Sequence, residues 1–315
     1  MFSKTQEVKS PRTAYGKALV ELGKKDENIV VLDADLSCST QTCLFAKEFP
    51  ERFFNIGIAE QDMMTTAAGL ATVGKTPFVS TFAMFATARC LDQIRNSICY
   101  PKLNIKIVAT HGGITVGEDG ASHQALEDIA FMRAIPDIMV IVPADYEEVT
   151  QVIKYAAAYK GPMYIRVSRT NLQSVFSDKY EFSPHKAVKI THGDDVTIVT
   201  NGETLIEAIK AEEILRTKGI GAEILHVPVI KPFLAKDDVI QSAIKTGRVV
   251  TIENHSIIGG LGSAVCEILS ENAPTKTLRI GTLDTFGQSG EQRALVKHYG
   301  LDYESIARKI TEFLK

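Results

Sequence analysis

The chain has 315 residues, 45% of them hydrophobic, and its 35 basic and 38 acidic residues are mixed along its length to a formal net charge of −3. These values predict a globular protein of roughly two domains, and the lack of a basic run argues against nucleic acid as a partner. No apolar run reaches the roughly 20 residues of a membrane span, and the first residues lack the apolar core of a secretory signal, so we expect a cytoplasmic protein.

Short β-branched runs alternate with longer amphipathic segments, which predicts the α/β class with parallel sheets covered by helices. Ser10 and Pro11 form a capping pair, so a helix is expected to begin there and to run to Leu22. Further strands are expected at residues 29–35, 53–55, 76–82, 106–110, 138–142 and 163–167, with helices at 60–73, up to 94, at 126–133 and after 145.

From Thr170 to about Asp195 the sequence becomes turn-rich and charged, which is typical of a linker. A second alternating block follows, with strands expected at 196–200, 222–227, 248–252 and 277–280 and helices near 207–216, after 260 and at the end of the chain. We therefore predict two doubly wound domains, at residues 1–175 and 195–315, with a linker at 176–194.

The cysteines are odd in number and lack both CxxC spacing and accompanying metal-like histidine pairs. Neither a disulfide framework nor a zinc site is therefore expected, and buried free thiols are the favoured interpretation. The cysteines are Cys38, Cys43, Cys90, Cys99 and Cys266.

Glu60 stands where an expected strand ends and a helix rich in Ala, Gly and Met begins. Burial among apolar neighbours disfavours the charged form of a carboxyl group, which suits a group that donates or shares a proton. The alternative is a glutamate that merely complements the helix dipole, and taken alone this is the more frequent case.

Residues 111–123 concentrate His111, His123, Glu118, Asp119 and four glycines. Histidines bind hydroxyls and oxyanions and move protons near neutral pH, and glycines permit turns and the close approach of a ligand. This density favours a functional site over a solvated, turn-rich loop.

Three polar residues are expected at or near the ends of elements, where side chains of α/β sheets converge on ligand crevices. They are Arg12, Ser39 and Arg169. Arginine favours two-pronged contacts with phosphate, but each residue viewed singly is more often a capping or salt-bridge residue. Phe82 and Phe85 are likewise more often core.

The segment IIGGLGSAV at residues 257–265 lacks the full GxGxxG spacing and a following acidic partner. We interpret it as tight strand-to-helix packing rather than a dinucleotide site. The HExxH and GxSxG motifs are also absent from the sequence, which argues against the enzyme classes that these motifs mark.

Several longer motifs occur together: FFNIGIAEQDM, STFAMFA, ATHGGITVGEDGASHQALED, PADYEEV, IRVSRTN and DTFGQSGEQRALVKHYGL. In this combination the chain closely resembles the transketolase family over nearly its whole length, as a pyrimidine-binding domain followed by a smaller C-terminal domain. The segment THxxxxVGEDGxxHQ is its most specific part. The resemblance implies a thiamine diphosphate enzyme that transfers a two-carbon ketol unit from a ketose phosphate to an aldose phosphate.

The same resemblance implies roles for the cofactor residues. Glu60 would hydrogen-bond the pyrimidine N1′ and so promote loss of the thiazolium C2 proton. Phe82 and Phe85 would pack on the pyrimidine ring, although the family's next aromatic residue is Ala88 here. Asp35 would approach the cofactor across a subunit interface.

For the substrate, the resemblance matches Asp119 to an aspartate that contacts a sugar hydroxyl and His123 to a histidine near the reacting carbons, where it helps to stabilise charge. The residues that match the family's sugar-phosphate channel are Arg12, Ser39, His111 and Arg169.

In the family the diphosphate is held through magnesium, or calcium or manganese, at a GDG motif with a downstream asparagine. This sequence contains no GDG. The resemblance therefore implies an N-terminal partner subunit that carries the motif and most of the metal contacts, in an α2β2 assembly. No metal site is expected on this chain.

Two related activities are alternatives. A 1-deoxy-D-xylulose-5-phosphate synthase shares the Glu60 motif but lacks the TH at 110–111 and the FGQSG ending, and the β subunit of a 2-oxo-acid dehydrogenase lacks the VGEDGxxHQ pattern. A non-catalytic regulatory relative is a third alternative, against which the joint presence of Glu60, Asp119 and His123 argues. The preferred sugars stay open, because specialised transketolases share this residue set.

Overall fold

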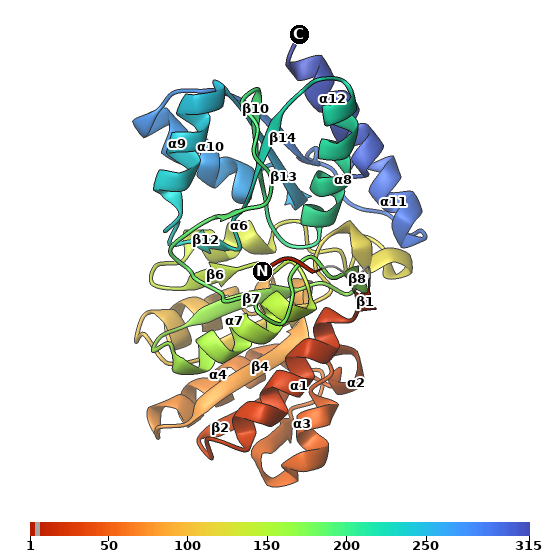
Figure 1. Cartoon of the computed structure of the whole chain (residues 1–315). Helices are drawn as coiled ribbons and strands as arrows, with labels where there is room; N and C mark the ends of the chain where they lie inside the picture. Colours follow the sequence, from red (N-terminus) through yellow and green to blue (C-terminus); the bar gives the residue numbers. More distant parts are fainter. Residues whose placement is uncertain (4–6) are drawn as a thin grey trace.

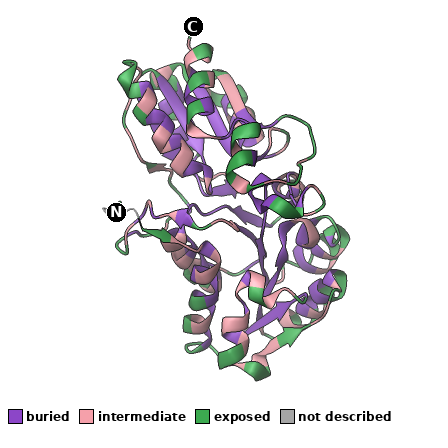
Figure 2. Ribbon diagram, turned by 90° about the vertical axis from the view of Figure 1, so that its right-hand side faces the viewer, coloured by how far each residue is buried: buried purple, intermediate pink, exposed green. Residues whose placement is uncertain are grey.

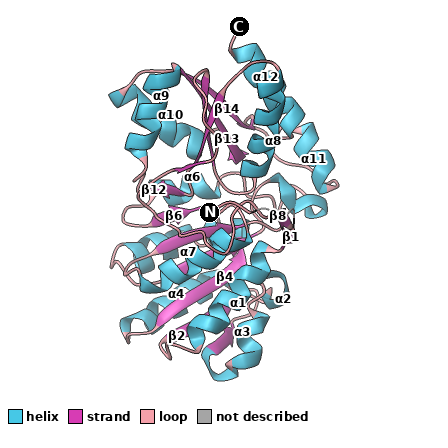
Figure 3. Ribbon diagram, in the orientation of Figure 1, coloured by secondary structure: helices cyan, strands magenta, loops and turns pink. Residues whose placement is uncertain are grey.

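The computed structural model describes residues 1–3 and 7–315, which form two large sheets stacked one above the other, each covered by helices on both faces (Figures 1 and 3). The first sheet has the strand order β12-β6-β7-β5-β4-β2-β3. Its neighbours are parallel except for β12, which runs antiparallel to β6. The strands are β2 (Ile29–Asp33), β3 (Phe53–Asn55), β4 (Thr76–Phe82), β5 (Lys106–Thr110), β6 (Met139–Ile141), β7 (Met163–Val167) and β12 (Val229–Lys231).

Alternate residues of the central strands point to opposite faces of this sheet, where each meets a different helical layer. Val31 of β2 lies in the core formed with α1, α3 and α7, whereas Val30 lies in the core formed with α4, α5, η2 and α6. Strands buried on both faces are typical of parallel sheets. The helical segments are α1 (Pro11–Gly23), α2 (Ser37–Thr40), α3 (Cys43–Glu48), η1 (Pro50–Arg52), α4 (Glu60–Thr72), α5 (Ala83–Thr87), η2 (Gln93–Cys99), η3 (Ile114–Asp119), α6 (Asp128–Ala134) and α7 (Tyr146–Ala158).

The second sheet has the order β14-β13-β10-β11-β9 and is parallel except for β9. Ile198 of β10 packs toward α8, α11 and α12, and Val199 packs toward α9 and α10. Its elements are β9 (Val188–Lys189), β10 (Val196–Thr200), α8 (Thr204–Thr217), β11 (Ala222–His226), α9 (Lys236–Thr246), β13 (Arg248–Ser256), α10 (Leu261–Asn272), β14 (Lys276–Thr282), α11 (Gln292–His298) and α12 (Tyr303–Phe313). The predicted α/β class with two doubly wound units is confirmed.

The segment between the two sheets is packed against both of them. Phe176 and Tyr180 are each only 1% exposed, and the Tyr180 hydroxyl donates to Glu148 of α7 at 2.7 Å. His226 of β11 contacts the other oxygen of Glu148, also at 2.7 Å. This segment therefore contacts the buried layers of both units, and Figure 2 shows buried residues where the two units meet. A small antiparallel pair, β1 (Val8–Lys9) with β8 (Leu172–Gln173), lies beside it.

Local chemistry explains where the expected elements differ from the observed ones. The strand expected at 29–35 ends at Asp33, whose carboxylate accepts the main-chain N–H of Leu36 at 2.6 Å and the Thr40 hydroxyl at 2.7 Å. These bonds turn the chain into α2. The helix expected to end at residue 94 is wrong there, because α5 stops at Thr87 and the π-helix η2 continues to Cys99.

Within the described residues, no helix is both long and apolar enough to cross a membrane. All five cysteines are free thiols. Cys90 and Cys99 are buried as expected, whereas Cys38 is exposed.

Candidate active site

The carboxyl ends of five parallel strands in the first sheet carry the residues predicted for the site. Asp35 follows β2, Glu60 follows β3, Phe82 ends β4, His111 follows β5 and Arg169 follows β7. These strands are successive neighbours, so their carboxyl ends meet at one edge. Ligands of open α/β sheets bind at this edge.

Glu60 is the first residue of α4, and its side chain is only 5% exposed. Its Oε1 accepts from Nη1 of Arg89 at 2.9 Å, and the amide of Gln61 donates to the main-chain oxygen of Arg89 at 2.8 Å. Glu60 therefore has an arginine partner in addition to the apolar neighbours that the sequence predicts. Because Arg89 is 48% exposed, its guanidinium can give way to a ligand.

Four rings form a continuous aromatic cluster at the same edge. His111 stacks on Phe82 with 3.8 Å between ring centroids, and Phe85 lies 5.9 Å from Phe82. His123 meets Phe85 edge-on at 5.1 Å. The guanidinium of Arg89 lies 4.0 Å above the Phe85 ring, which connects the cluster to Glu60. This arrangement provides a flat apolar face beside a buried carboxylate.

His111 is held as a neutral ring. Burial, with the positive charges of Arg12 and Arg169 nearby, lowers its pKa to about 3, so it is uncharged at physiological pH. Its Nδ1 lies 2.7 Å from the Thr110 hydroxyl. The backbone of His111 has φ of +60°, a conformation that is rare for residues other than glycine and frequent at functional sites.

Two arginines lie near His111, and one of them has a buried N–H without a hydrogen-bond partner among the described residues. Arg12 donates from Nη1 to the main-chain oxygen of Ser39 at 2.8 Å, while its buried Nε has no hydrogen-bond partner among the described residues. Burial and the charge of Arg169 lower the pKa of Arg12. Arg169 donates to the main-chain oxygen of Val116 and lies 3.3 Å from the carboxylate of Glu118. A buried, unpaired N–H on one cation with a second cation nearby suits an anionic ligand.

The segment between β14 and α11 of the second unit packs on the glycine-rich loop, residues 111–123. Gly120, with φ of +75°, faces Ser289 so closely that a Cβ atom would clash with its hydroxyl. The amide of Gln124 donates to the main-chain oxygen of Gln288 at 3.0 Å, and Gly287 has no room for a side chain against Gln124. The FGQSG motif, residues 286–290, therefore packs against the glycine-rich loop and limits its movement.

The remaining predicted residues lie at the rim. Asp119 ends η3 and is exposed, and its carboxylate makes no hydrogen bond or ion pair with the described part of the chain. His123 is half-buried, with Nδ1 2.9 Å from the Ser122 hydroxyl. Asp35 is exposed with φ of +64°, and its carboxylate accepts from the amide of Asn55 at 3.0 Å. The rings and arginines are thus brought together, whereas the carboxylates of Asp35 and Asp119 stay outside that cluster.

Comparison with known protein families identifies the family of this chain. The model of the transketolase pyrimidine-binding domain matches residues 8–175, and that of the transketolase C-terminal domain matches residues 185–306. The chain belongs to the transketolase family.

Several relatives of this transketolase-family chain are similar over nearly their full length. A protein described as a transketolase C-terminal section from Methanocaldococcus jannaschii is 54% identical over 312 residues, which is 98% of this chain and 97% of that protein. The 6-deoxy-6-sulfo-D-fructose transketolase subunit of a Clostridium species is 41% identical, with 96% and 93% covered. A subunit of an apulose-4-phosphate transketolase from Phocaeicola vulgatus is 39% identical, with 96% and 97% covered.

A solved structure described as a split-gene transketolase in an inactive β4 tetramer has a TM-score of 0.90 and 50% identity, and the match covers 97% of this chain and 98% of that one. The transketolase of Campylobacter jejuni has a TM-score of 0.83 at 20% identity, and only 48% of it is covered. The latter likeness concerns the fold alone.

Several residues of this candidate site were not singled out in the sequence. Arg89 follows Ala88, where the family has an aromatic residue, and no pattern marks it as a partner of Glu60. Arg166 belongs to the IRVSRTN motif but lies inside the strand β7, where no local signal marks it as functional, and Glu203 and Asn254 come from the second unit. No cluster of three or more His, Cys, Asp or Glu side chains that could hold a metal ion occurs among residues 1–3 and 7–315.

Proposed function

We propose that this chain is the C-terminal subunit of a split transketolase, which transfers a two-carbon ketol unit from a ketose phosphate to an aldose phosphate when joined to an N-terminal partner. The single observation that carries the proposal is the set of groups at one sheet edge. A buried carboxylate, Glu60, lies beside the ring cluster of Phe82, Phe85, His111 and His123. The chain's membership of the transketolase family supports this proposal.

Thiamine diphosphate, when bound, supplies the nucleophilic carbon that breaks a carbon–carbon bond beside a ketone. The residues present fit its pyrimidine end: Phe82 and Phe85 offer a ring face, and Glu60 offers a carboxyl group that can share a proton with a ring nitrogen. Displacement of the half-exposed Arg89 would free that carboxyl group. Asp35, at the exposed rim, is proposed to approach the cofactor from a neighbouring subunit.

The substrate would lie between the histidines and the arginines. We assign the sugar's anionic end to Arg12, Ser39, His111 and Arg169, because the orphaned Nε of Arg12 and the neighbouring cation attract an oxyanion. Asp119 and His123 would face the hydroxyls and reacting carbons. Two relatives are named for a sulfonated and a phosphorylated sugar, and both kinds of sugar carry such an oxyanion.

The diphosphate end of the cofactor would be held by the partner. Magnesium, or calcium or manganese in its place, bridges phosphate and protein oxygens, and we assign most of these contacts to an N-terminal subunit that carries the GDG motif. An α2β2 assembly in the cytoplasm would place the active site between the two kinds of chain. The relative described as an inactive β4 tetramer is consistent with a chain that needs such a partner.

The test is reconstitution. The purified chain alone is expected to have no thiamine-diphosphate-dependent ketol transfer, and addition of the GDG-carrying subunit from the same organism should produce it. Transfer by this chain alone, with partner contamination excluded by mass spectrometry, would contradict the proposal. Parallel assays of pyruvate condensation and of reductive acylation of a lipoyl domain test the two related activities.

A further inference from the structure

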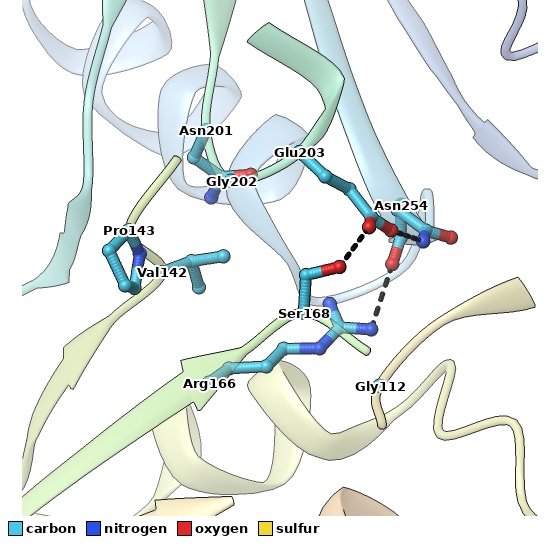
Figure 4. Close-up of a pocket in the computed structure, with 9 residues that line it drawn as sticks. All are labelled: Gly112, Val142, Pro143, Arg166, Ser168, Asn201, Gly202, Glu203 and Asn254. Atoms are coloured by element: carbon cyan, nitrogen blue, oxygen red, sulfur yellow. Dashed lines mark hydrogen bonds between the residues drawn. The ribbon is translucent and has the colours of Figure 1, made fainter. Parts of the chain in front are cut away.

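A carboxylate of the second unit connects the two segments that carry the proposed sugar-binding groups. Glu203 lies just before α8 and receives the hydroxyl of Ser168, which precedes Arg169 (Figure 4). Its other oxygen receives the hydroxyl of Thr115, in the glycine-rich loop, at 2.6 Å. One side chain therefore spans the gap between the Arg169 segment and the loop.

Asn254 of β13 holds the same loop through both ends of its amide. Its Oδ1 accepts the main-chain N–H of Ile114 at 3.0 Å, and its Nδ2 donates to Thr115 at 3.0 Å and to Glu203. Gly113, with φ of +79°, lies so close that a Cβ atom would clash with the Asn254 amide. The asparagine is 6% exposed, so water is a poor substitute for these bonds.

Arg166 of β7 connects the end of the glycine-rich loop to Asn254. Its Nη2 donates to the main-chain oxygens of Ala125 and Asn254, at 3.2 Å and 3.0 Å, and its guanidinium excludes any side chain at Gly112. Asp128 pairs with it at 3.3 Å. Both ends of the loop that carries His111 and His123 are thus fixed against the second unit.

We propose that Glu203 and Asn254 are positioning residues that set the distance between the glycine-rich loop, which carries His111 and His123, and Arg169. This distance determines the length of the sugar that fits between the reacting carbons and the proposed anion site. The inference rests on the proposed function. It gives the C-terminal domain a part in substrate binding, through the loop rather than through contact with the substrate. If the pair only stabilised the contact between the two units, its substitution would change the stability of the protein and leave the KM of the folded enzyme unaltered.

The hydrogen bond between Asn254 and Glu203 can be tested by exchanging its donor and its acceptor. In Asn254→Asp, two carboxylates face each other and the donor to Thr115 is lost, so kcat/KM for a phosphorylated ketose should fall about tenfold, mainly through KM. In Glu203→Gln, the amide can turn its oxygen toward Asn254 and its NH2 group toward Ser168, so the effect should be small. The double variant restores one donor opposite one acceptor and should recover most of the loss.

The kinetic arm uses the complex with the N-terminal subunit, and Asn272→Asp, an exposed residue of α10, serves as the control. The second arm needs no activity: hydrogen exchange of the Ile114 amide in the full chain should accelerate in Asn254→Asp and return toward the wild-type rate in the double variant. A double variant no better than Asn254→Asp in either arm, or an Asn254→Asp variant with unchanged KM, would overturn the inference. An inactive wild-type complex would refute the proposed function, while the exchange arm would still test the bridge.

Discussion

Glu60 combines burial with a partner that solvent can reach, and this makes it the most informative single residue. In Glu60→Gln the amide keeps the shape of the side chain but cannot share a carboxyl proton with the pyrimidine. We expect the variant to fold normally and the reconstituted enzyme to lose most exchange of the cofactor's C2 hydrogen, by about 100-fold or more. Proton NMR of C2 hydrogen–deuterium exchange measures this directly.

Asp62 provides the matched control. It lies in the same first turn of α4 but is exposed, so Asp62→Asn alters helix charge without touching the cluster. Unchanged C2 exchange in Glu60→Gln would remove Glu60 from the activating role.

Arg169 contributes charge to the proposed anion site. Arg169→Ala should cost about 1.5–3 kcal/mol of binding to phosphorylated sugars, roughly a 10- to 150-fold loss in kcat/KM, because a charge-assisted hydrogen bond is removed. Non-phosphorylated donors should be affected much less. A panel of ketoses with and without a phosphate group, assayed with the partner subunit, measures the difference.

Arg293→Ala removes the same charge from an exposed position at the start of α11, and should leave both donor classes unaffected. Equal losses for both classes in Arg169→Ala would show that Arg169 does not bind the phosphate. His111 is a weaker choice for this experiment, since its ring also stacks on Phe82.

At the scale of elements, the start of α7 joins the two units through Glu148, which receives the hydroxyl of Tyr180, the ring of His226 and the main-chain N–H of Ala144. Tyr180→Phe removes one donor to a buried carboxylate and should lower the free energy of unfolding by about 1–3 kcal/mol. Urea denaturation followed by circular dichroism measures it. The control is Tyr155→Phe in α7, whose hydroxyl has no hydrogen-bond partner among the described residues, and this change should be neutral. Equal effects of the two substitutions would contradict this account.

Elements with local signals at their ends were predictable. Ser10 caps α1 and Pro11 opens it, and Asp145 caps α7 by accepting the main-chain N–H of Glu148 at 3.0 Å. By contrast, α9 was not predicted, because Ala235 provides no side-chain cap to mark its start. The three residues of β12 form a strand only because β6 offers them an edge.

For the molecule as a whole, the site was predictable where its residues follow parallel strands, since topology brings strand ends together. The positions of Phe82 and His111 follow from this rule. The bond from Ile114 to Asn254 joins residues 140 apart in the sequence, and nothing local to either residue indicates it. The Glu60–Arg89 pair was missed for a similar reason, because an arginine at an exposed position carries no periodic signal.

The strand β12 also restricts how this molecule can move. It leaves the second unit, pairs with β6 at the edge of the first sheet, and is anchored by the bond from Val142 N–H to the Pro228 oxygen at 2.8 Å. Gly202 then donates to the oxygen of Val142 at 3.1 Å. A hinge rotation of one sheet relative to the other would break these main-chain bonds, so the structure opposes an opening and closing of the two units as lobes. Access to the candidate site would instead depend on side-chain motion at its rim, where Arg89 and Asp119 are exposed and His123 is half-buried.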